Sequence, residues 1–310
     1  MRLLDCTLRD GAHINQGNFG RAFITDAVRA LTISGIDRIE LGFLEDVTRI
    51  EGCTYFPDVQ SAEEYLPSEC TPDNICLLTR PDRFDHRKLQ CRATGIKHIR
   101  VAFYAKDLAL AIHCGKHLND LGFMVSFNPI AITTVPRAEI QKICRALSFE
   151  DFETLSIVDT YGAFTLEAFV ACLEIFTEFC PGEKLGLHLH ENLSSSFTLA
   201  QLFSERCPGG VIDCSMTGMG RAPGNLPTEL IASFLNRYKK SDYKILTILD
   251  FSEDRVLPLK SVGQWGYEAP YMVSAINNID RTRAEECINS GMSHSECYSK
   301  LVTGQSNETL

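Results

Sequence analysis

Two histidines one residue apart, His188 and His190 in the segment "LGLHLH", are the strongest candidates for chemistry in the chain. Side chains alternate along a strand, so the two imidazoles would share one face, about 7 Å apart. At that spacing both rings can converge on one cation at about 2.1 Å each. An isolated pair of this kind can also be satisfied by backbone groups, so a metal site depends on what lies beside it.

A second group of reactive side chains follows the first apolar run, in "LLDCTLRDGAH". Arg9, Asp10 and His13 supply a cation, an anion and an imidazole. Arg9 and Asp10 could form a surface ion pair, or they could line an active site. Asp10 beside two imidazoles would make a mixed nitrogen and oxygen ligand set, which suits Mn²⁺, Mg²⁺, Co²⁺ or Zn²⁺. His13 suits a general base, because imidazole titrates near neutrality.

Strands must position these residues, and apolar, β-rich runs recur along the chain with helical patterns between most of them. Most runs are continuous, as expected for parallel strands buried on both faces. Eight such units predict an α/β fold, a (β/α)₈ TIM barrel, in which the first and eighth strands are neighbours. A doubly wound open sheet is the alternative, but the Gly-rich loop expected after its first strand is missing. The predicted strands are 2–7, 38–43, 75–79, 98–103, 123–128, 155–160, 185–190 and 211–216.

Helical periodicity is clear in "ITDAVRALTISG", "LALAIHCGKHLNDLG" and "LEAFVACLEIFTEFC". The alternation of strands and helices stops near residue 240, and the tail indicates only short helices. We therefore predict a barrel domain over residues 1–244 and a helical extension over 245–310 packed on the barrel. The segment 45–74 is a long loop that could cover a functional surface.

The carboxyl ends of barrel strands form the active face of this fold. Those ends add Glu40, Asn128 and Asp159, and the eighth strand leads into "TGMGRAPGN", which contains Arg221 and Asn225. Plainer interpretations remain open for three of them. Glu40 could be a structural carboxylate, Asp159 could cap a helix through "DTYG", and Asn128 could only turn the chain before a proline.

Composition limits the class of protein. Apolar residues make up 45% of the 310 and charged residues 23%, which is ordinary for a globular protein with a sizeable core. The net charge of −10 argues against a nucleic-acid or anionic-membrane surface, because both need clustered Lys and Arg. The thirteen cysteines form no CxxC pair, and we interpret them as buried free thiols of a reducing compartment. With no leader or spanning segment found, we expect a cytoplasmic protein.

An ordered set of motifs carries a family resemblance: "LRDGAH", "IELGF", "DTYG", "HLHENL" and "GMGRAPGNLPTE". Over residues 3 to about 240 the chain resembles the DRE-TIM metallolyase superfamily, which includes 4-hydroxy-2-oxovalerate aldolase, hydroxymethylglutaryl-CoA lyase and the homocitrate and isopropylmalate synthases. The resemblance implies one divalent cation, with Mn²⁺ favoured. It implies that Asp10, His188 and His190 bind the metal, with Asn225 as a further ligand.

The same resemblance assigns catalytic roles. Arg9 would stabilise an enolate oxygen, and Glu40 would orient Arg9 or the substrate pocket. His13 points to the ketoacid aldolases, in which the histidine of "LRDG-x-H" is the general base. The segment "GYEAPYM" is similar to an aldolase segment whose tyrosine supports that base, which maps onto Tyr271, with Tyr267 as second choice.

The resulting hypothesis is reversible cleavage of a 4-hydroxy-2-oxo acid into an aldehyde and a pyruvate-type enolate. The candidate substrate-binding residues are Asp159, Asn128 and Arg221. Arg221 stands in the region where the lyases have a Gly-rich loop that holds a cysteine. We expect a homo-oligomer, with an aldehyde dehydrogenase as a possible partner. The alternatives are an acyl-CoA Claisen enzyme with the same metal and a catalytically silent barrel subunit of a dehydrogenase complex.

Overall fold

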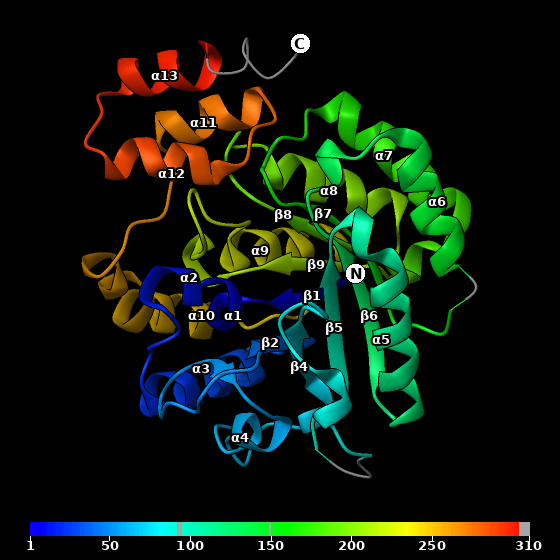
Figure 1. Ribbon diagram of the computed structural model, residues 1–310. Coiled ribbons are helices and arrows are strands. Elements are labelled where there is room, and N and C mark those ends of the chain that lie inside the picture. Colours follow the sequence, from blue (N-terminus) through cyan, green and yellow to red (C-terminus); the bar gives the residue numbers. More distant parts are fainter. Residues whose placement is uncertain (92–94, 149, 304–310) are drawn as a thin grey trace.

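Eight parallel strands close into a barrel (Figure 1) in the computed structural model, which describes residues 1–91, 95–148 and 150–303. β1 pairs with β2 on one side and with β9 on the other. This closure confirms the predicted TIM barrel and rules out an open sheet. The barrel strands are β1 (Arg2–Asp5), β2 (Arg38–Leu44), β4 (Ile75–Thr79), β5 (His98–Phe103), β6 (Met124–Pro129), β7 (Leu155–Asp159), β8 (Leu185–Leu189) and β9 (Val211–Cys214).

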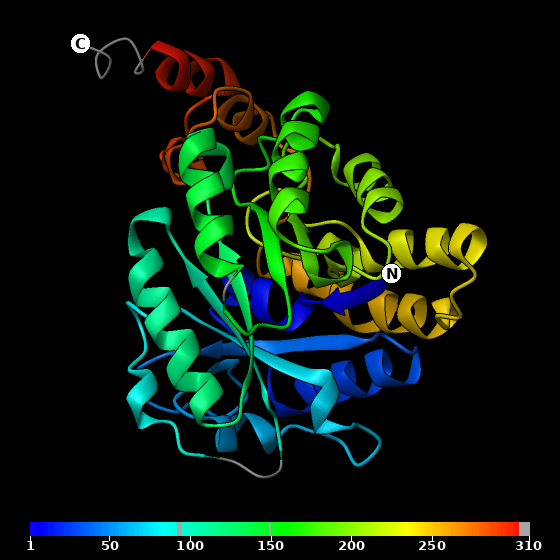
Figure 2. The same cartoon turned by 90° about the vertical axis from the view of Figure 1, so that its right-hand side faces the viewer.

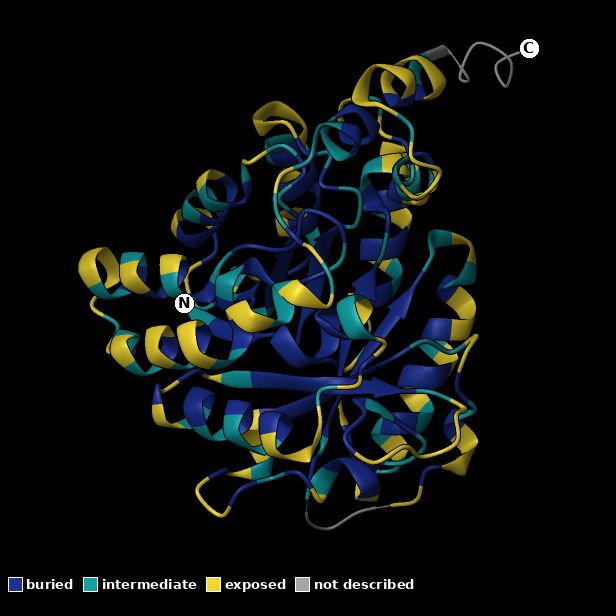
Figure 3. Ribbon diagram, turned by 90° about the vertical axis from the view of Figure 1, so that its left-hand side faces the viewer, coloured by how far each residue is buried: buried dark blue, intermediate teal, exposed yellow. Residues whose placement is uncertain are grey.

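Helices surround the barrel (Figure 2), and they bury one face while exposing the other (Figure 3). The three helices predicted from periodicity correspond to α3, α5 and α7, and α3 and α5 are followed by Gly35 and Gly122 with φ of +81° and +88°. Glycine adopts such a φ without strain, so it ends a helix readily. The helices around the barrel are α3 (Arg21–Ile33), α5 (Leu108–Asp120), α6 (Arg137–Leu147), α7 (Leu166–Phe179), α8 (Ser196–Arg206) and α9 (Thr228–Lys239).

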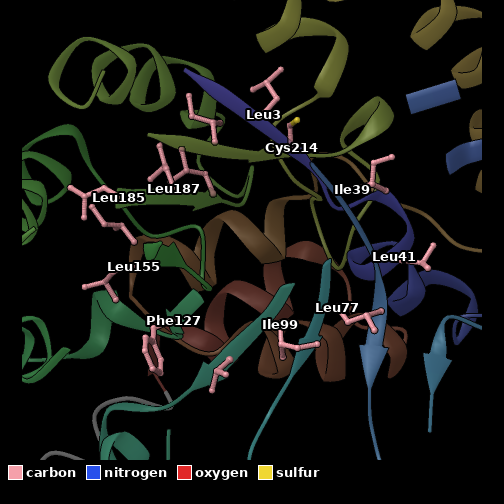
Figure 4. Close-up of a cluster of buried hydrophobic side chains, with 14 of the residues drawn as sticks. Leu3, Ile39, Leu41, Leu77, Ile99, Phe127, Leu155, Leu185, Leu187 and Cys214 are labelled. Atoms are coloured by element: carbon pink, nitrogen blue, oxygen red, sulfur yellow. The ribbon is translucent and has the colours of Figure 1, made fainter. Parts of the chain in front are cut away.

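The apolar core lies between the strands and the helices. Side chains from all eight barrel strands contribute to it (Figure 4), among them Leu3, Ile39, Leu77 and Ile99, each at most 1% exposed. Residues at alternate positions along the same strands point into the barrel. Several of those are charged: Arg100 of β5 contacts Glu40 of β2 and Asp213 of β9. The inside of the barrel is therefore partly ionic.

The chain leaves β1 earlier than the sequence predicted. β1 ends at Asp5, and two short helices follow, α1 (Thr7–Asp10) and α2 (Ala12–Asn15). The Asp5 carboxylate accepts a hydrogen bond from the Thr7 amide at 2.9 Å, which starts this turn. Arg9 and Asp10 thus stand on a buried helical turn above the strand. β2 runs on past Glu40 to Leu44, so Glu40 lies inside the barrel wall and not at a strand end.

The long connection over residues 45–74 has structure of its own. It contains β3 (Tyr55–Phe56), α4 (Val59–Glu63) and the 3₁₀ turn η1 (Pro72–Asn74). β3 adds to β2, and the Tyr55 ring stacks on Phe43 with ring centroids 5.0 Å apart. The other 3₁₀ turns that precede the tail are η2 (His86–Lys88), η3 (Ala105–Asp107), η4 (Ile132–Thr134), η5 (Gly182–Lys184) and η6 (Met216–Gly218).

The tail is helical, as predicted, but it falls into two parts. α10 (Ile245–Phe251), the π turn η7 (Ser252–Val256) and the 3₁₀ turn η8 (Leu257–Ser261) lie against the barrel, and Ile248 and Val256 belong to its core. α11 (Ala269–Ile276), α12 (Arg281–Asn289) and α13 (His294–Thr303) stack together at the top of Figure 1. They share a separate small apolar cluster that includes Val273, Cys287 and Leu301. No helix within the described residues has the length and apolar character needed to cross a bilayer.

Candidate functional site

A cavity of about 340 Å³ lies at the carboxyl ends of the barrel strands. α1, α2, the strand ends, the loop after β9 and the start of α12 form its walls. Most residues predicted from the sequence line it: Arg9, Asp10, His13, Asn128, His188, His190 and Arg221.

Three of these residues form a compact, buried group of potential metal ligands. The ligand atoms of Asp10, His188 and His190 all lie within 4.8 Å of one another, and each residue is at most 4% exposed. The centroids of the two imidazole rings are 5.1 Å apart, and the rings are nearly perpendicular. No other such group of three histidine, cysteine or acidic side chains occurs among the described residues.

Hydrogen bonds determine which imidazole nitrogen faces the site. His188 Nδ1 lies 3.1 Å from Asp213 Oδ2, and His190 Nδ1 lies 3.1 Å from the Gly224 carbonyl oxygen. Both partners are acceptors, so each histidine donates its Nδ1–H and carries its lone pair on Nε2. This arrangement orients a histidine as a metal ligand.

A network of buried ion pairs connects Asp10 with His188. Arg9 donates from Nη1 to Asp10 at 2.6 Å and from Nε to Glu40 at 2.5 Å. Glu40 also accepts from Arg100 at 2.8 Å, and Arg100 donates to Asp213 at 2.6 Å. Asp213 in turn holds His188. This network of ion pairs therefore fixes both the Asp10 carboxylate and the His188 ring.

The charges of this ion-pair network keep Asp10 ionised. Asp10, Glu40 and Asp213 are three carboxylates against the two guanidiniums of Arg9 and Arg100. Burial alone would raise the pKa of Asp10, but the adjacent Arg9 cation holds that pKa well below its usual value. Asp10 is therefore ionised at neutral pH and available as a ligand.

Asn225 offers a further ligand atom. Its Nδ2 donates to Asp10 Oδ2 at 2.5 Å, while its Oδ1 is buried without a hydrogen-bond partner among the described residues. A buried acceptor left unpaired is destabilising, and a cation would satisfy it. Gly220 makes room for this arrangement, because a Cβ there would lie 2.4 Å from Asn225 Nδ2 and 2.8 Å from Asp10 Oδ2. Asp10, His188 and His190 thus fit a divalent cation, and the unpaired Asn225 oxygen is a further donor on the residue that contacts Asp10.

His13 lies on α2, at the edge of the ligand group. Its Nε2 is 3.8 Å from Asp10 Oδ1, and its ring packs edge-on against the Phe43 ring, with the two ring centroids 5.7 Å apart. About a third of the side chain remains exposed, at 32%, on the side that faces the cavity. Burial of the rest of the ring lowers the pKa of His13 to about 4. The Arg281 and Arg9 cations also lower this pKa, whereas the Asp10 carboxylate raises it. The imidazole is therefore neutral at pH 7 and can accept a proton.

The three predicted substrate-binding residues have different surroundings. Asn128 lines the cavity, and its buried Oδ1 has no partner among the described residues. Arg221 also lines the cavity but forms a bidentate pair with Glu285, at 2.8 and 2.5 Å. Asp159 accepts hydrogen bonds from the Ala163 and Phe164 amides at 2.8 and 3.0 Å, which builds the turn after β7. Its carboxylate is not part of the cavity lining.

The tyrosines are arranged differently from the sequence expectation. Tyr271 lies on α11 and packs against the small cluster of α11–α13, and it is not among the residues that line the cavity. Tyr267 is 63% exposed. Tyr104 and Tyr161 line the cavity instead, and Tyr161 donates to Asp280 Oδ2 at 3.2 Å.

Sequence reasoning missed three charged residues at the site. Arg100 and Asp213 interrupt the apolar runs "HIRVAF" and "VIDCSM", and a charge in the middle of a buried strand was a usable signal. Arg281 gave no such signal, because it begins an ordinary polar helix. The structure places it 7% exposed in the cavity wall, donating to the Thr160 carbonyl at 2.7 Å and to His190 Nε2 at 3.1 Å.

The other thiols and imidazoles lie outside this cavity. All thirteen cysteines are free, and only Cys91 is exposed, as expected for buried thiols. The remaining histidines are core or surface residues. His86 and His98 are buried, whereas His113, His117 and His294 lie on helices.

Comparison with known proteins gives a consistent assignment. The HMGL-like family model matches residues 1–254. The 4-hydroxy-2-oxovalerate aldolase 6 of Rhodococcus jostii (strain RHA1) is 27% identical over 271 residues, covering 83% of this chain and 74% of the relative. The 4-hydroxy-2-oxovalerate aldolase of Roseiflexus sp. (strain RS-1) is 26% identical over 273 residues, covering 83% and 77%.

Solved structures share the fold. The N-terminal domain of a candidate aldolase from Bacteroides vulgatus superposes with a TM-score of 0.80 at 23% identity, covering 93% of this chain and 97% of that one. The HMG-CoA lyase of Brucella melitensis superposes with a TM-score of 0.64 at 15% identity, covering 84% and 98%. At these identities the likeness concerns the barrel architecture alone.

Proposed function

The chain belongs to the HMGL-like family, and we propose that it is a divalent-metal-dependent lyase that breaks or forms a carbon–carbon bond in a 4-hydroxy-2-oxo acid. Cleavage gives an aldehyde and a pyruvate-type enolate. The observation that carries this proposal is the convergence of Asp10, His188 and His190 in a cavity that Arg9 and His13 also line. The relatives named 4-hydroxy-2-oxovalerate aldolase support the choice of substrate class.

Asp10, His188 and His190 would hold the cation, with Asn225 Oδ1 as a fourth ligand. When bound, the cation supplies Lewis-acid stabilisation of negative charge on the ketoacid oxygens. Two nitrogen and two oxygen ligands suit several divalent ions, of which we favour Mn²⁺. Because every ligand is buried and held by further hydrogen bonds, the site needs little rearrangement of these side chains to bind a cation.

Arg9 would stabilise the enolate. Glu40 and Asp10 hold its Nε and Nη1, which leaves Nη2 without a hydrogen-bond partner among the described residues. A guanidinium fixed in this way can donate to an oxygen on which charge develops, at no cost of reorganisation. Glu40 acts here as a positioning residue, since it contacts Arg9 and Arg100 inside the barrel.

His13 would move the proton. Its neutral imidazole takes the proton of the substrate's 4-hydroxyl, and the O–H electrons form the aldehyde carbonyl. The electron pair of the C3–C4 bond then passes into the enolate. In the condensation direction the protonated His13 returns that proton to the new hydroxyl. Asn128, with its unpaired Oδ1, faces the same cavity and can bind a substrate hydroxyl.

Two expectations from the sequence remain proposals with structural support. A cytoplasmic location is supported by the thirteen free thiols, which persist in a reducing compartment. A helical unit after the barrel is supported by the separate apolar cluster of α11–α13. Homo-oligomer formation and an aldehyde dehydrogenase partner remain predictions.

The proposed function is tested by assaying the Mn²⁺-loaded protein with pyruvate and a panel of aldehydes. We expect aldol addition that stops when the cation is chelated. The double variant His188→Ala/His190→Ala should fold, lose the cation in elemental analysis and lose activity, whereas His294→Ala, at an exposed position of α13, should change none of these. Full metal occupancy in the double variant would refute the site. A requirement for a CoA thioester would replace the aldolase assignment by Claisen chemistry.

A further inference from the structure

Arg281 differs from every other arginine in the cavity wall. Arg9, Arg80, Arg83 and Arg221 each have a carboxylate within 4 Å, provided by Asp10 and Glu40, Asp82, Glu45 and Glu285 respectively. Arg281 has no carboxylate within 4 Å among the described residues, although only 7% of the residue is exposed. A buried guanidinium without an anion is destabilising, so this one calls for a ligand.

The contact between Arg281 and His190 cannot coexist with a bound cation. His190 donates its Nδ1–H to the Gly224 carbonyl, so Nε2 has a single lone pair in the ring plane. Arg281 Nη1 donates to that lone pair at 3.1 Å. A cation on His190 needs the same lone pair and also repels the guanidinium. Cation binding must therefore release this donor, and only the Thr160 carbonyl then remains of its two hydrogen-bond partners.

We propose that Arg281 is a substrate-binding residue, which takes the carboxylate of the ketoacid once the cation has displaced it from His190. This inference rests on the proposed function and adds to it a residue from outside the barrel. The guanidinium presents several N–H donors in a plane, a geometry that matches a carboxylate. The site would thereby bind the ketoacid from two sides, from the barrel through the ligand group and from the C-terminal helices through Arg281.

The start of α12 keeps Arg281 in place. Asp280 caps the helix by accepting from the Thr282 amide at 2.9 Å, and it also accepts from the Tyr161 hydroxyl at 3.2 Å. Asp280 and Thr282 line the cavity on either side of Arg281. The hydrogen bond from Tyr161 connects this turn to the loop after β7, so the α12 start is attached to the barrel mouth independently of Arg281.

The test uses the full-length protein and calorimetric titrations. Arg281→Met should bind Mn²⁺ at least as tightly as the wild type, because a competing donor and a like charge are gone. In the Mn²⁺-loaded protein its Kd for pyruvate should rise about 10- to 100-fold, the range expected when a charged hydrogen bond is lost. Arg281→Lys keeps the positive charge but lacks the planar guanidinium, so its Kd for pyruvate should rise by a smaller factor. Arg283→Met, two residues on in the same helix and outside the cavity lining, is the matched control and should behave as wild type.

A comparison of ligands separates carboxylate binding from a structural role. The wild type should prefer pyruvate to its uncharged methyl ester, and Arg281→Met should lose most of that preference. If circular dichroism shows that Arg281→Met does not fold, the test rests on Arg281→Lys, whose preference for pyruvate over the methyl ester should be reduced.

Unchanged pyruvate binding in a folded, Mn²⁺-loaded Arg281→Met protein would overturn the inference while leaving the proposed function intact. Loss of Mn²⁺ binding in that variant would also overturn it, because Arg281 would then support the ligand group. A wild-type protein that binds neither Mn²⁺ nor pyruvate would instead overturn the proposed function, and this inference with it.

Discussion

Arg9 and His13 face one cavity but are held in different ways. Arg9 is fixed by two buried carboxylates, Asp10 and Glu40. His13 lies on a short helix with a third of its side chain open to the cavity, and among the described residues Asp10 is its only carboxylate partner within 4 Å. A rigid cation suits the stabilisation of charge, and an accessible neutral imidazole suits the transfer of a proton.

The two residues should therefore fail differently when they are replaced. Arg9→Ala should lose both aldol cleavage and the exchange of the C3 protons of pyruvate, because both reactions pass through an enolate. His13→Ala should lose cleavage by about 10²- to 10⁴-fold but keep more of the exchange, which does not need the 4-hydroxyl proton. The measurement compares deuterium uptake into pyruvate with the aldolase rate at equal metal loading.

Two outcomes would contradict this division of roles. Normal cleavage by His13→Ala would remove the base assignment, and with it a main reason for preferring the aldolase reaction. Equal losses of both reactions in both variants would leave the ligand group in place but not the separate roles of Arg9 and His13.

Asp213 acts on the site through His188. It accepts from both His188 Nδ1 and Arg100, so it holds the ring and keeps the lone pair on Nε2. Asp213→Asn removes the charge and should weaken Mn²⁺ binding about 10- to 100-fold, the usual effect of losing such a partner. A Mn²⁺ titration checks this, with Asp250→Asn on the exposed face of α10 as the control. An unchanged Mn²⁺ affinity would mean that His188 is oriented without Asp213.

Among the elements, the loop after β9 shapes the site most closely. It brings Asn225 against Asp10, and Gly220 leaves the space in which these two side chains meet. The first residues after β1 complete this corner of the barrel, since Met216 donates its amide to the Thr7 hydroxyl at 2.7 Å. Strand closure and loop packing thus place ligands from the two ends of the barrel sequence together.

Gly220→Ala tests this packing. The new Cβ would lie 2.4 Å from Asn225 Nδ2, so Asn225 or Asp10 must move, and we expect weaker Mn²⁺ binding together with about 1–3 kcal/mol of lost stability. Gly115→Ala on α5 is the matched control, because its Cβ would meet Phe127 Cζ at 2.5 Å far from the ligands. The control should lose similar stability in thermal unfolding yet keep its Mn²⁺ affinity. Equal Mn²⁺ affinities in the two variants would argue against the role of the loop.

At the scale of the whole molecule, the barrel and the last three helices have separate apolar clusters. Leu301 of α13 belongs to the small cluster, and Leu199 of α8 belongs to the large one, each 1% exposed. The two units meet at the cavity, where Arg221 pairs with Glu285 and Arg281 contacts His190. The helices can therefore loosen without unfolding the barrel.

Leu301→Ala should show this independence. Removing a buried leucine side chain costs about 2–5 kcal/mol, and here the loss falls on a small cluster. We expect faster amide hydrogen exchange in α11–α13 and a small change in the Tm of the barrel. Leu199→Ala should lower that Tm clearly. A similar decrease of Tm in both variants would show that the two units unfold together.

The sequence alone determined the strands, the barrel and the histidine pair. Continuous apolar runs with helical periods between them identify parallel strands from local information, and the period of two places His188 and His190 on one face. Closure of eight strands then makes the first and last strands neighbours, so Asp10 could be placed beside the histidines. The two histidines were predictable from regular backbone geometry and Asp10 from barrel closure, although the helical turn that carries Asp10 was not predicted.

The tertiary structure alone decided how these residues are held and what else reaches them. Arg100 meets Asp213 across 113 positions of sequence, and Arg281 reaches His190 across 91. Neither contact leaves a periodic trace, because it depends on the packing of side chains from elements distant in the chain. The early end of β1 was likewise invisible, since a buried hydrogen bond from Thr7 to Asp5 starts the turn that carries Arg9 and Asp10. Local pattern specifies elements, whereas the pairing of charges within a cavity follows only when those elements pack.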